Sequence, residues 1–333
     1  MPFITRFIAS QMRTLPPLPD VDLRGRTYIV TGANSGIGLE IVRHLAVRHA
    51  STIILAVRNL SSGEHAMGTI YNELPRGHGV EMKVWHVDMS SLASVNEFAN
   101  KCASLDRIDG VALNAGVLGG KEYVKTRDGH EELTQVNVLS PIFLALLLMP
   151  LLRRTAGQVA SIAQPLLSPR IIFTGSAIAE MAPTKFFDVE NPLLGLDDER
   201  RYRPSTRYDE SKVSSGVVGN IGISQLLKLI PDIVITDVNP GFVDTPLYRH
   251  STGPAGSMVR RIGRSPEVGA RNVSMALLTL DKSVDFYHDC RPCKLHVDWL
   301  GSSNGIQFSE NLWRESCDEF ERNHPGVMQR AGI

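Results

Sequence analysis

Short apolar segments alternate with longer amphipathic segments along most of the chain. Short segments rich in Val, Ile and Thr predict buried strands, whereas longer segments with apolar residues three and four positions apart predict helices. We expect strands at Thr27–Thr31, Thr52–Val57, Val80–Val87, Gly110–Leu113, Arg170–Thr174 and Ile233–Val238. We expect helices at Ile37–Arg48, Ser61–Leu74, Leu92–Leu105, Glu131–Arg153 and Asp209–Leu229.

This alternation predicts an α/β fold: a single Rossmann-type, doubly wound parallel sheet with helices on both faces. The predicted strands are apolar almost throughout, as burial on both faces requires. Neither repeats nor a linker-like composition divides the chain. We therefore expect an extended, proline-containing lead-in over residues 1–24 and one domain over residues 25–333.

One region interrupts the alternation. Residues 177–207 contain Pro183, Pro192 and Pro204 together with the charged run 197–201. Two interpretations remain open for this insertion. It is either a solvated surface segment or part of a lid over a substrate site.

The charge balance narrows the function classes. Lys and Arg together number 35, as do Asp and Glu, so the formal net charge of the 333-residue chain is zero. This balance argues against a sequence-wide attraction to nucleic acid. The longest apolar run, Val138–Leu152, is shorter than the roughly 20 residues needed to cross a bilayer, so we interpret it as a buried helix rather than an integral span. Without a secretory signal, we expect a cytoplasmic protein.

The four cysteines predict neither a disulfide framework nor a metal site. They are few and scattered for a chain of this length. Cys290 and Cys293 form a C-x-x-C pair, but no second ligand pair accompanies it. We interpret these residues as ordinary reduced thiols.

A glycine-rich turn joins the first predicted strand to the first predicted helix. Its sequence is Thr-Gly-Ala-Asn-Ser-Gly-Ile-Gly, and we expect the cofactor contacts to come from Gly32, Asn34, Ser35, Gly36, Ile37 and Gly38. Glycines there permit a tight turn, a close approach of the backbone to phosphate, and close packing of helix on strand. The start of the helix would face the diphosphate, because unpaired N–H groups and the helix dipole favour anions.

With this turn, the chain resembles the classical short-chain dehydrogenase/reductase family, and TGANSGIG, AVRN and LNAG resemble its retinol-dehydrogenase-like branch. Further family elements follow in the family's order over about residues 25–280. They are Asp88 against the adenine, Asn114-Ala115-Gly116, the tetrad Asn137, Ser176, Tyr208 and Lys212, and Asn239-Pro240-Gly241 with Val243 and Thr245 at the nicotinamide end. The resemblance implies that residues 281–333 shape one wall of the substrate pocket. It also implies that the chain can form a homodimer through its two long helices, although the run Phe143–Leu152 could equally be intramolecular core.

The end of the second predicted strand bears on the choice of cofactor. An NAD enzyme places an acidic residue there to bind both ribose hydroxyls. Val57 stands in that position, and Arg58 follows it. An arginine can pair with the 2′-phosphate, so we predict NADP(H).

The predicted acid/base pair is Tyr208 and Lys212, which lie four residues apart and therefore share one face of a helix. The phenol pKa is ordinarily about 10, and a neighbouring ammonium favours the phenolate. Ser176 would hold the substrate oxygen, although it could instead be a helix cap. The resemblance assigns Lys212 to the nicotinamide ribose as well, and Asn137 to a water in a proton relay.

We therefore predict an NADP(H)-dependent oxidoreductase that interconverts a small-molecule carbonyl compound and an alcohol, with a biosynthetic, polyketide-type ketone as the favoured substrate. The apparent lack of an N-terminal anchor favours that class over retinol or another lipid alcohol. A non-catalytic module that only binds cofactor is a further alternative. We would expect such a module to have lost Tyr208, Lys212 or Ser176, and the chain retains all three.

Overall fold

The apolar segments form one central sheet. The computed structural model describes residues 3–160, 168–216, 232–248 and 261–332. The strands in it are β1 (Thr27–Thr31), β2 (Thr52–Val57), β3 (Glu81–His86), β4 (Gly110–Leu113), β5 (Arg170–Thr174), β6 (Val234–Asn239), β7 (Val284–His288) and β8 (Arg291–Cys293). Their order across the sheet is β3-β2-β1-β4-β5-β6-β7-β8. All neighbouring strands run parallel except β7 and β8, which pair antiparallel.

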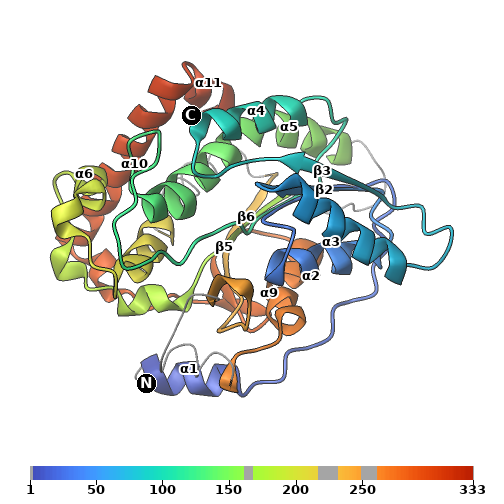
Figure 1. Cartoon of the computed structure of the whole chain (residues 1–333), viewed down its shortest axis with the longest axis horizontal. Helices are drawn as coiled ribbons and strands as arrows, with labels where there is room; N and C mark the ends of the chain where they lie inside the picture. The colour runs from blue at the N-terminus through green and yellow to red at the C-terminus, as the bar shows by residue number, and fades with distance from the viewer. Residues whose placement is uncertain (1–2, 161–167, 217–231, 249–260, 333) are drawn as a thin grey trace.

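Both faces of the sheet are covered by helices, as predicted. One face carries α2 (Gly36–Ala46), α3 (Leu60–Glu73) and α9 (Pro266–Thr279), and the other carries α4 (Leu92–Cys102) and α5 (Ser140–Ala160) (Figure 1). Neighbouring strand residues alternate between the two layers. In β1, for example, Ile29 packs with α4 and α5, whereas Tyr28 and Val30 pack with α2 and α9.

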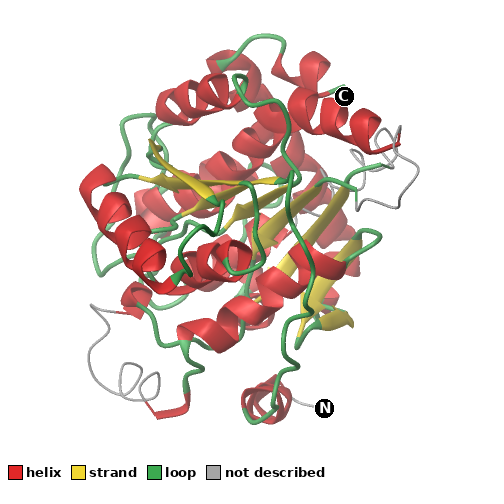
Figure 2. Ribbon diagram, turned by 90° about the vertical axis from the view of Figure 1, so that its right-hand side faces the viewer, coloured by secondary structure: helices red, strands yellow, loops and turns green. Residues whose placement is uncertain are grey.

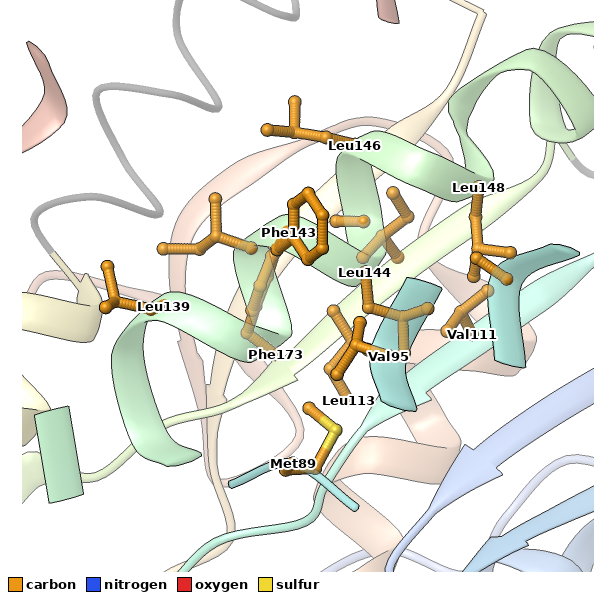
Figure 3. Close-up of a cluster of buried hydrophobic side chains, with 14 of the residues drawn as sticks. Met89, Val95, Val111, Leu113, Leu139, Phe143, Leu144, Leu146, Leu148 and Phe173 are labelled. Atoms are coloured by element: carbon orange, nitrogen blue, oxygen red, sulfur yellow. The ribbon is translucent and has the colours of Figure 1, made fainter. Parts of the chain in front are cut away.

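The apolar run predicted as a buried helix belongs to α5. Residues Thr134–Gln158 are long and apolar enough to cross a membrane, but 89% of their most apolar window is buried inside the molecule. Figure 3 shows Phe143, Leu144 and Leu148 of this helix gathered with side chains of the sheet and of α4. This confirms the interpretation as a core helix. Phe143 also stacks on Phe320 at 5.2 Å, so this part of the run is intramolecular core.

The C-terminal region forms a further layer outside α5. It consists mainly of α10 (Ser303–Asn323) and α11 (Val327–Ala331), at the upper left of Figure 1. Figure 2, turned by 90°, shows the strands of the sheet between helices. Buried Phe308, Leu312 and Phe320 of α10 join the same core as α5.

The insertion 177–207 packs against α10. It contains α6 (Pro192–Asp197) and the short 3-10 helices η2 (Ala177–Met181), η3 (Thr184–Phe186) and η4 (Glu199–Arg201). Phe187 stacks on Phe308 of α10 with ring centroids 4.6 Å apart. The Leu193 N–H donates to Glu315 of α10 at 2.8 Å. Much of the insertion is therefore fixed on the C-terminal layer.

Two predicted helices differ in detail. The long helix expected over Glu131–Arg153 begins as the π-helical turn η1 (Thr134–Leu139) and continues as α5 to Ala160. The helix expected over Asp209–Leu229 is helical at 207–216, and residues 217–229 lie outside the described part. The lead-in is extended from residue 13 onward, but an unpredicted helix, α1 (Phe3–Gln11), precedes it.

Candidate active site

The glycine-rich turn lies between β1 and α2. Gly32 and Gly36 adopt φ values of +66° and +54°, which favour glycine. A Cβ on Gly38 would collide with the carbonyl oxygen of Gly32, so the third glycine permits close packing of helix on strand. Ser35 precedes α2 without forming a side-chain cap. The first N–H groups of α2 therefore remain available for an anion.

Asn114 and Ala115 fasten the end of β4 to the start of this turn. Their backbone N–H groups donate to Thr31 Oγ1 at 2.9 and 3.0 Å, and Asn114 Nδ2 donates to the Thr31 carbonyl at 3.0 Å. The strand order reverses between β1 and β4. Ligands of open α/β sheets bind at such a switch point, beyond the carboxyl ends of the strands. The turn and the Asn114–Gly116 element therefore lie together at this switch point.

Arg58 and Asp88 follow the ends of β2 and β3. Arg58 is exposed, and its side chain has no hydrogen bond or ion pair with the residues that the structure describes. Asp88 accepts hydrogen bonds from the N–H and the hydroxyl of Ser90 at 2.9 and 2.7 Å. Val57 is buried, and a Cβ on Gly63 of α3 would lie 2.8 Å from its Cγ2. Val57 therefore carries no acidic group that would repel a 2′-phosphate. The exposed Arg58 side chain is accessible to such a phosphate.

The segment after β6 lies beside the glycine-rich turn. A Cβ on Gly36 would sit 3.1 Å from Thr245 Cγ2. Gly241 adopts φ +86°, which allows the chain to turn directly after Pro240. Val243 is buried, and a Cβ on Gly269 of α9 would lie 2.5 Å from its Cγ2, so its side chain faces α9. Any ligand contact of Val243 would come from its backbone.

Lys212 and Tyr208 project from the helical segment 207–216 toward the end of β5. The Lys212 Nζ atom donates to the Thr174 carbonyl oxygen at 2.9 Å and lies 5.7 Å from the centroid of the Tyr208 ring. Burial lowers the pKa of Lys212, and this effect is partly offset by the Asp237 carboxylate. Burial also raises the pKa of Tyr208 well above its ordinary value, with a further contribution from neighbouring Tyr248. Tyr208 is therefore protonated at neutral pH in this structure.

Ser176 follows β5 and caps the 3-10 helix η2. Its Oγ accepts a hydrogen bond from the Ile178 N–H at 3.2 Å, so the capping role considered from the sequence is present. A hydroxyl that accepts this bond still has its own proton to donate to a substrate oxygen. The residue lies two positions after Thr174, whose carbonyl binds Lys212.

Asn137 lies in the π-helical turn η1, a type of irregularity often found at functional sites. Its side chain bonds both backbone groups of Val117 at 2.9 Å and donates to Ser211 Oγ at 3.1 Å. A Cβ on Gly116 would lie 3.1 Å from Asn137 Oδ1. Asn137 therefore connects the chain after β4 to the helix that carries Tyr208 and Lys212.

A buried carboxyl group that was not predicted from the sequence lies next to Lys212. Asp237 of β6 is 4% exposed, and its Oδ1 has no hydrogen-bond partner among the described residues. Burial raises its pKa to about 7, although Lys212 opposes the shift. A Cβ on Gly175 would collide with this carboxyl group. The available signal was an aspartate inside an otherwise apolar strand, which is costly without a partner.

Cys290 and Cys293 lie at the β7–β8 hairpin as free thiols. Burial raises the pKa of each thiol to about 11, which disfavours the reactive thiolate. Among the described residues, no group of three or more His, Cys, Asp or Glu side chains could hold a metal ion.

The chain is similar to known proteins of one family. A family model for short chain dehydrogenase matches residues 26–165. The chain is 32% identical to a short-chain dehydrogenase of Penicillium roqueforti, over 96% of this chain and 84% of that protein. It is 31% identical to a short chain dehydrogenase/reductase of Annulohypoxylon moriforme, over 98% of this chain and 94% of that one. The chain belongs to the short-chain dehydrogenase family.

Solved structures of low sequence identity share the fold of this short-chain dehydrogenase. A Thermococcus sibiricus alcohol dehydrogenase complexed with 5-hydroxy-NADP is 21% identical and has a TM-score of 0.55, covering 79% of this chain and 95% of that chain. The Pseudomonas aeruginosa RhlG/NADP active-site complex is 22% identical and has a TM-score of 0.57, covering 80% and 96%. The protein is an oxidoreductase of this family with an α/β sheet of the Rossmann type.

Proposed function

We propose that this short-chain dehydrogenase uses NADP(H) to interconvert a ketone or aldehyde and the corresponding alcohol by hydride transfer. The observation that carries the proposal is a pair of contacts at the carboxyl edge of the parallel sheet. Lys212 bonds the end of β5 beside the Tyr208 ring, and the segment with Thr245 contacts the glycine-rich turn. A nicotinamide cofactor lying on the turn would extend toward the acid/base pair.

The residues of this chain fit a phosphorylated dinucleotide. The uncapped start of α2 offers N–H groups to the diphosphate. Gly32 and Gly36 have positive φ values, and a Cβ on either would lie 3.1 Å from Ala115 Cα or Thr245 Cγ2, so only glycine allows this tight turn. Arg58 supplies an accessible guanidinium at the end of β2, where it can pair with a 2′-phosphate. The NADP-complexed structures named above provide further support for NADP(H) over NAD(H).

In the proposed reaction, Tyr208 gives its phenolic proton to the carbonyl oxygen. The cofactor, when bound, supplies the hydride to the carbonyl carbon. Ser176 holds the same oxygen by a hydrogen bond and so orients the substrate. The Lys212 ammonium stabilises the phenolate that remains after the proton leaves. Because burial keeps Tyr208 protonated, its hydroxyl can serve as the proton donor that carbonyl reduction requires.

For the substrate, we propose a biosynthetic ketone of the secondary-metabolite or polyketide type. The two relatives reported above, from the fungi Penicillium roqueforti and Annulohypoxylon moriforme, match nearly the full chain. A retinol-type or other lipid alcohol is the second candidate, on the strength of the sequence motifs TGANSGIG, AVRN and LNAG.

The test is a turnover assay on purified protein with a panel of ketones, aldehydes, retinal and their alcohols. Each substrate is offered with NADPH or NADP⁺ and, separately, with NADH or NAD⁺. We expect carbonyl-dependent oxidation of NADPH, with kcat/KM for NADPH at least about tenfold above that for NADH, as expected from one charge-assisted phosphate pair. A preference for NADH of tenfold or more would refute the cofactor assignment. Tight NADPH binding without turnover on any substrate would favour the non-catalytic module.

A further inference from the structure

The N-terminal helix α1 contacts the segment that follows β6. Both the oxygen and the nitrogen of the side-chain amide of Gln11, the last residue of α1, form hydrogen bonds there. The Oε1 atom accepts from the Phe242 N–H at 3.0 Å, while Nε2 donates to the carbonyl oxygens of Phe242 and Ile262 at 3.0 and 2.9 Å. Figure 1 shows α1 apart from the helices that cover the sheet, near the N-terminus. One side chain thus holds two backbone positions that are twenty residues apart.

A buried polar network fixes the same end of α1. The Ser10 hydroxyl donates to Asp289 at 2.9 Å and contacts the His288 ring at 2.7 Å. Arg264 donates to the Ser10 carbonyl oxygen at 2.6 Å and to Asp289 at 2.8 Å. His288 in turn contacts the Asn239 side chain at 3.0 Å. The network therefore reaches the first residue of the Asn-Pro-Gly element.

An aromatic series leads from α1 toward the acid/base pair. The Phe7 ring meets the Phe242 ring with centroids 5.8 Å apart, and Phe242 meets Tyr248 at 5.4 Å. Tyr248 is close enough to Tyr208 to raise the pKa of that residue, after the larger effect of burial. The surface that α1 covers is thus continuous with the surroundings of Tyr208.

The turn at Gly241 packs closely against the side chains of Arg264 and Gln11. A Cβ at this position would lie 2.7 Å from Arg264 Nη1 and 3.0 Å from Gln11 Oε1. The backbone between Asn239 and Phe242 is therefore confined by side chains from α1 and from the region before α9. Farther along the segment, Thr245 contacts Gly36 of the cofactor turn.

We propose that the end of α1, at Ser10 and Gln11, holds the segment after β6 in place and that Gln11 is a positioning residue for the cofactor. By fixing Phe242 and Ile262, Gln11 holds the segment 239–245 where the nicotinamide end of the cofactor needs it. This inference rests on the proposed function. Gln11 contacts no reacting group among the described residues. It therefore acts by raising the fraction of molecules in which the segment 239–245 is positioned to bind the cofactor.

Two substitutions separate the parts of this contact. Gln11→Met keeps the length of the side chain and removes all three hydrogen bonds. Gln11→Glu keeps the acceptor for the Phe242 N–H but places a carboxylate against two carbonyl oxygens. The matched control is Ile8→Ala, because Ile8 lies on the same helix with 52% of its surface exposed.

Three quantities are measured on the full-length chain: the NADPH dissociation constant by fluorescence, the steady-state constants, and hydrogen exchange at the Phe242 amide. We expect Gln11→Met to weaken NADPH binding and to raise the KM for NADPH about tenfold, with kcat at saturating NADPH within about twofold of the unmodified chain. Its Phe242 amide should exchange faster, whereas that amide should stay protected in Gln11→Glu. Ile8→Ala should match the unmodified chain in all three measurements.

The proposal is overturned if folded Gln11→Met binds NADPH as tightly as Ile8→Ala, whatever its exchange rate. It is also overturned if kcat falls while NADPH affinity is unchanged. If Gln11→Met does not fold, Gln11→Glu decides by the same measurement. Because Gln11→Glu loses both donated hydrogen bonds, it should bind NADPH more weakly than Ile8→Ala, and equal affinity overturns the proposal. An unmodified chain without NADPH affinity would refute the proposed function, and with it this role of Gln11. Because exchange at the Phe242 amide needs no cofactor, it still reports whether Gln11 holds the segment.

Discussion

His130 connects three parts of the molecule that are distant in sequence. Its Nδ1 atom lies 2.7 Å from Asp197 Oδ2, at the end of α6 in the insertion, and its Nε2 atom lies 3.4 Å from Glu319 Oε1 on α10. The His130 side chain is 8% exposed. Asp197 also accepts from the Glu131 N–H at 2.8 Å. Replacement of His130 by glutamine therefore tests how the insertion is fastened to the C-terminal layer.

The expected energy follows from the pKa of His130. Burial lowers this pKa, but the Asp197 and Glu319 carboxylates outweigh burial and raise it from 6.5 to about 9. Such a rise corresponds to about 3 kcal/mol of folding free energy. Because the folded-state pKa is above the unfolded-state pKa, this stabilisation is fully present below about pH 6.5. It is lost as the pH rises through about 9.

The assay is equilibrium urea unfolding of the unmodified chain and of His130→Gln at pH 6, 7.5 and 10. We expect the variant to be less stable by about 3 kcal/mol at pH 6 and the difference to shrink toward zero at pH 10. The control is His65→Gln, because His65 is exposed on α3 and has no ion pair among the described residues. A stability difference that is independent of pH, or that grows with rising pH, would refute the charged state assigned to His130.

Two further predictions concern the site. Arg58→Asp should reduce kcat/KM for NADPH about ten- to a hundredfold and leave kcat/KM for NADH equal or higher, because a carboxylate repels the 2′-phosphate. Steady-state kinetics with both cofactors measure this, and an equal loss of kcat/KM for NADPH and NADH would show that the assignment is wrong. Gly175→Ala should cost about 1–3 kcal/mol in urea unfolding, because its Cβ collides with the Asp237 carboxyl group. The same change should cost much less in an Asp237→Ala background, and additive effects would show that the two residues do not interact.

The central strands could be predicted because burial on both faces leaves an apolar pattern in the sequence. β1, β2, β4 and β5 coincide with their predicted ranges, and the predicted ranges for β3 and β6 differ from the observed ones by one residue at each end. The strand β7 was not predicted. It is only partly buried, with Asp285 exposed and Phe286 and Tyr287 buried, so its pattern is weaker.

The C-terminal helices depend on contacts that no local pattern shows. The helix α10 carries many charged residues, and its buried side chains are spaced over more than three turns. Phe308 and Phe320 become core residues only because Phe187 of the insertion and Phe143 of α5 stack on them. The family resemblance suggested that this region forms a wall of the substrate pocket. A single sequence does not show that the insertion and α5 are the segments it packs against.

The candidate site could be predicted as far as its motifs follow the ends of parallel strands. Thr31, Asn114 and Thr174 lie at or directly after β1, β4 and β5, so the topology alone brings their neighbours to one edge. Gln11 and Asp237 could not be found in the same way. The contact between Gln11 and Phe242 spans 231 residues, and neither residue belongs to a family motif named from the sequence.

The central claim is that Tyr208 protonates a carbonyl compound that receives hydride from NADPH. The most direct test is single-turnover oxidation of NADPH by a ketone substrate, compared between the unmodified chain and Tyr208→Phe. The substitution removes only the hydroxyl, so we expect unchanged folding and NADPH affinity with a rate constant lower by about two to four orders of magnitude. A Tyr208→Phe protein that oxidises NADPH at nearly the rate of the unmodified chain would contradict the account.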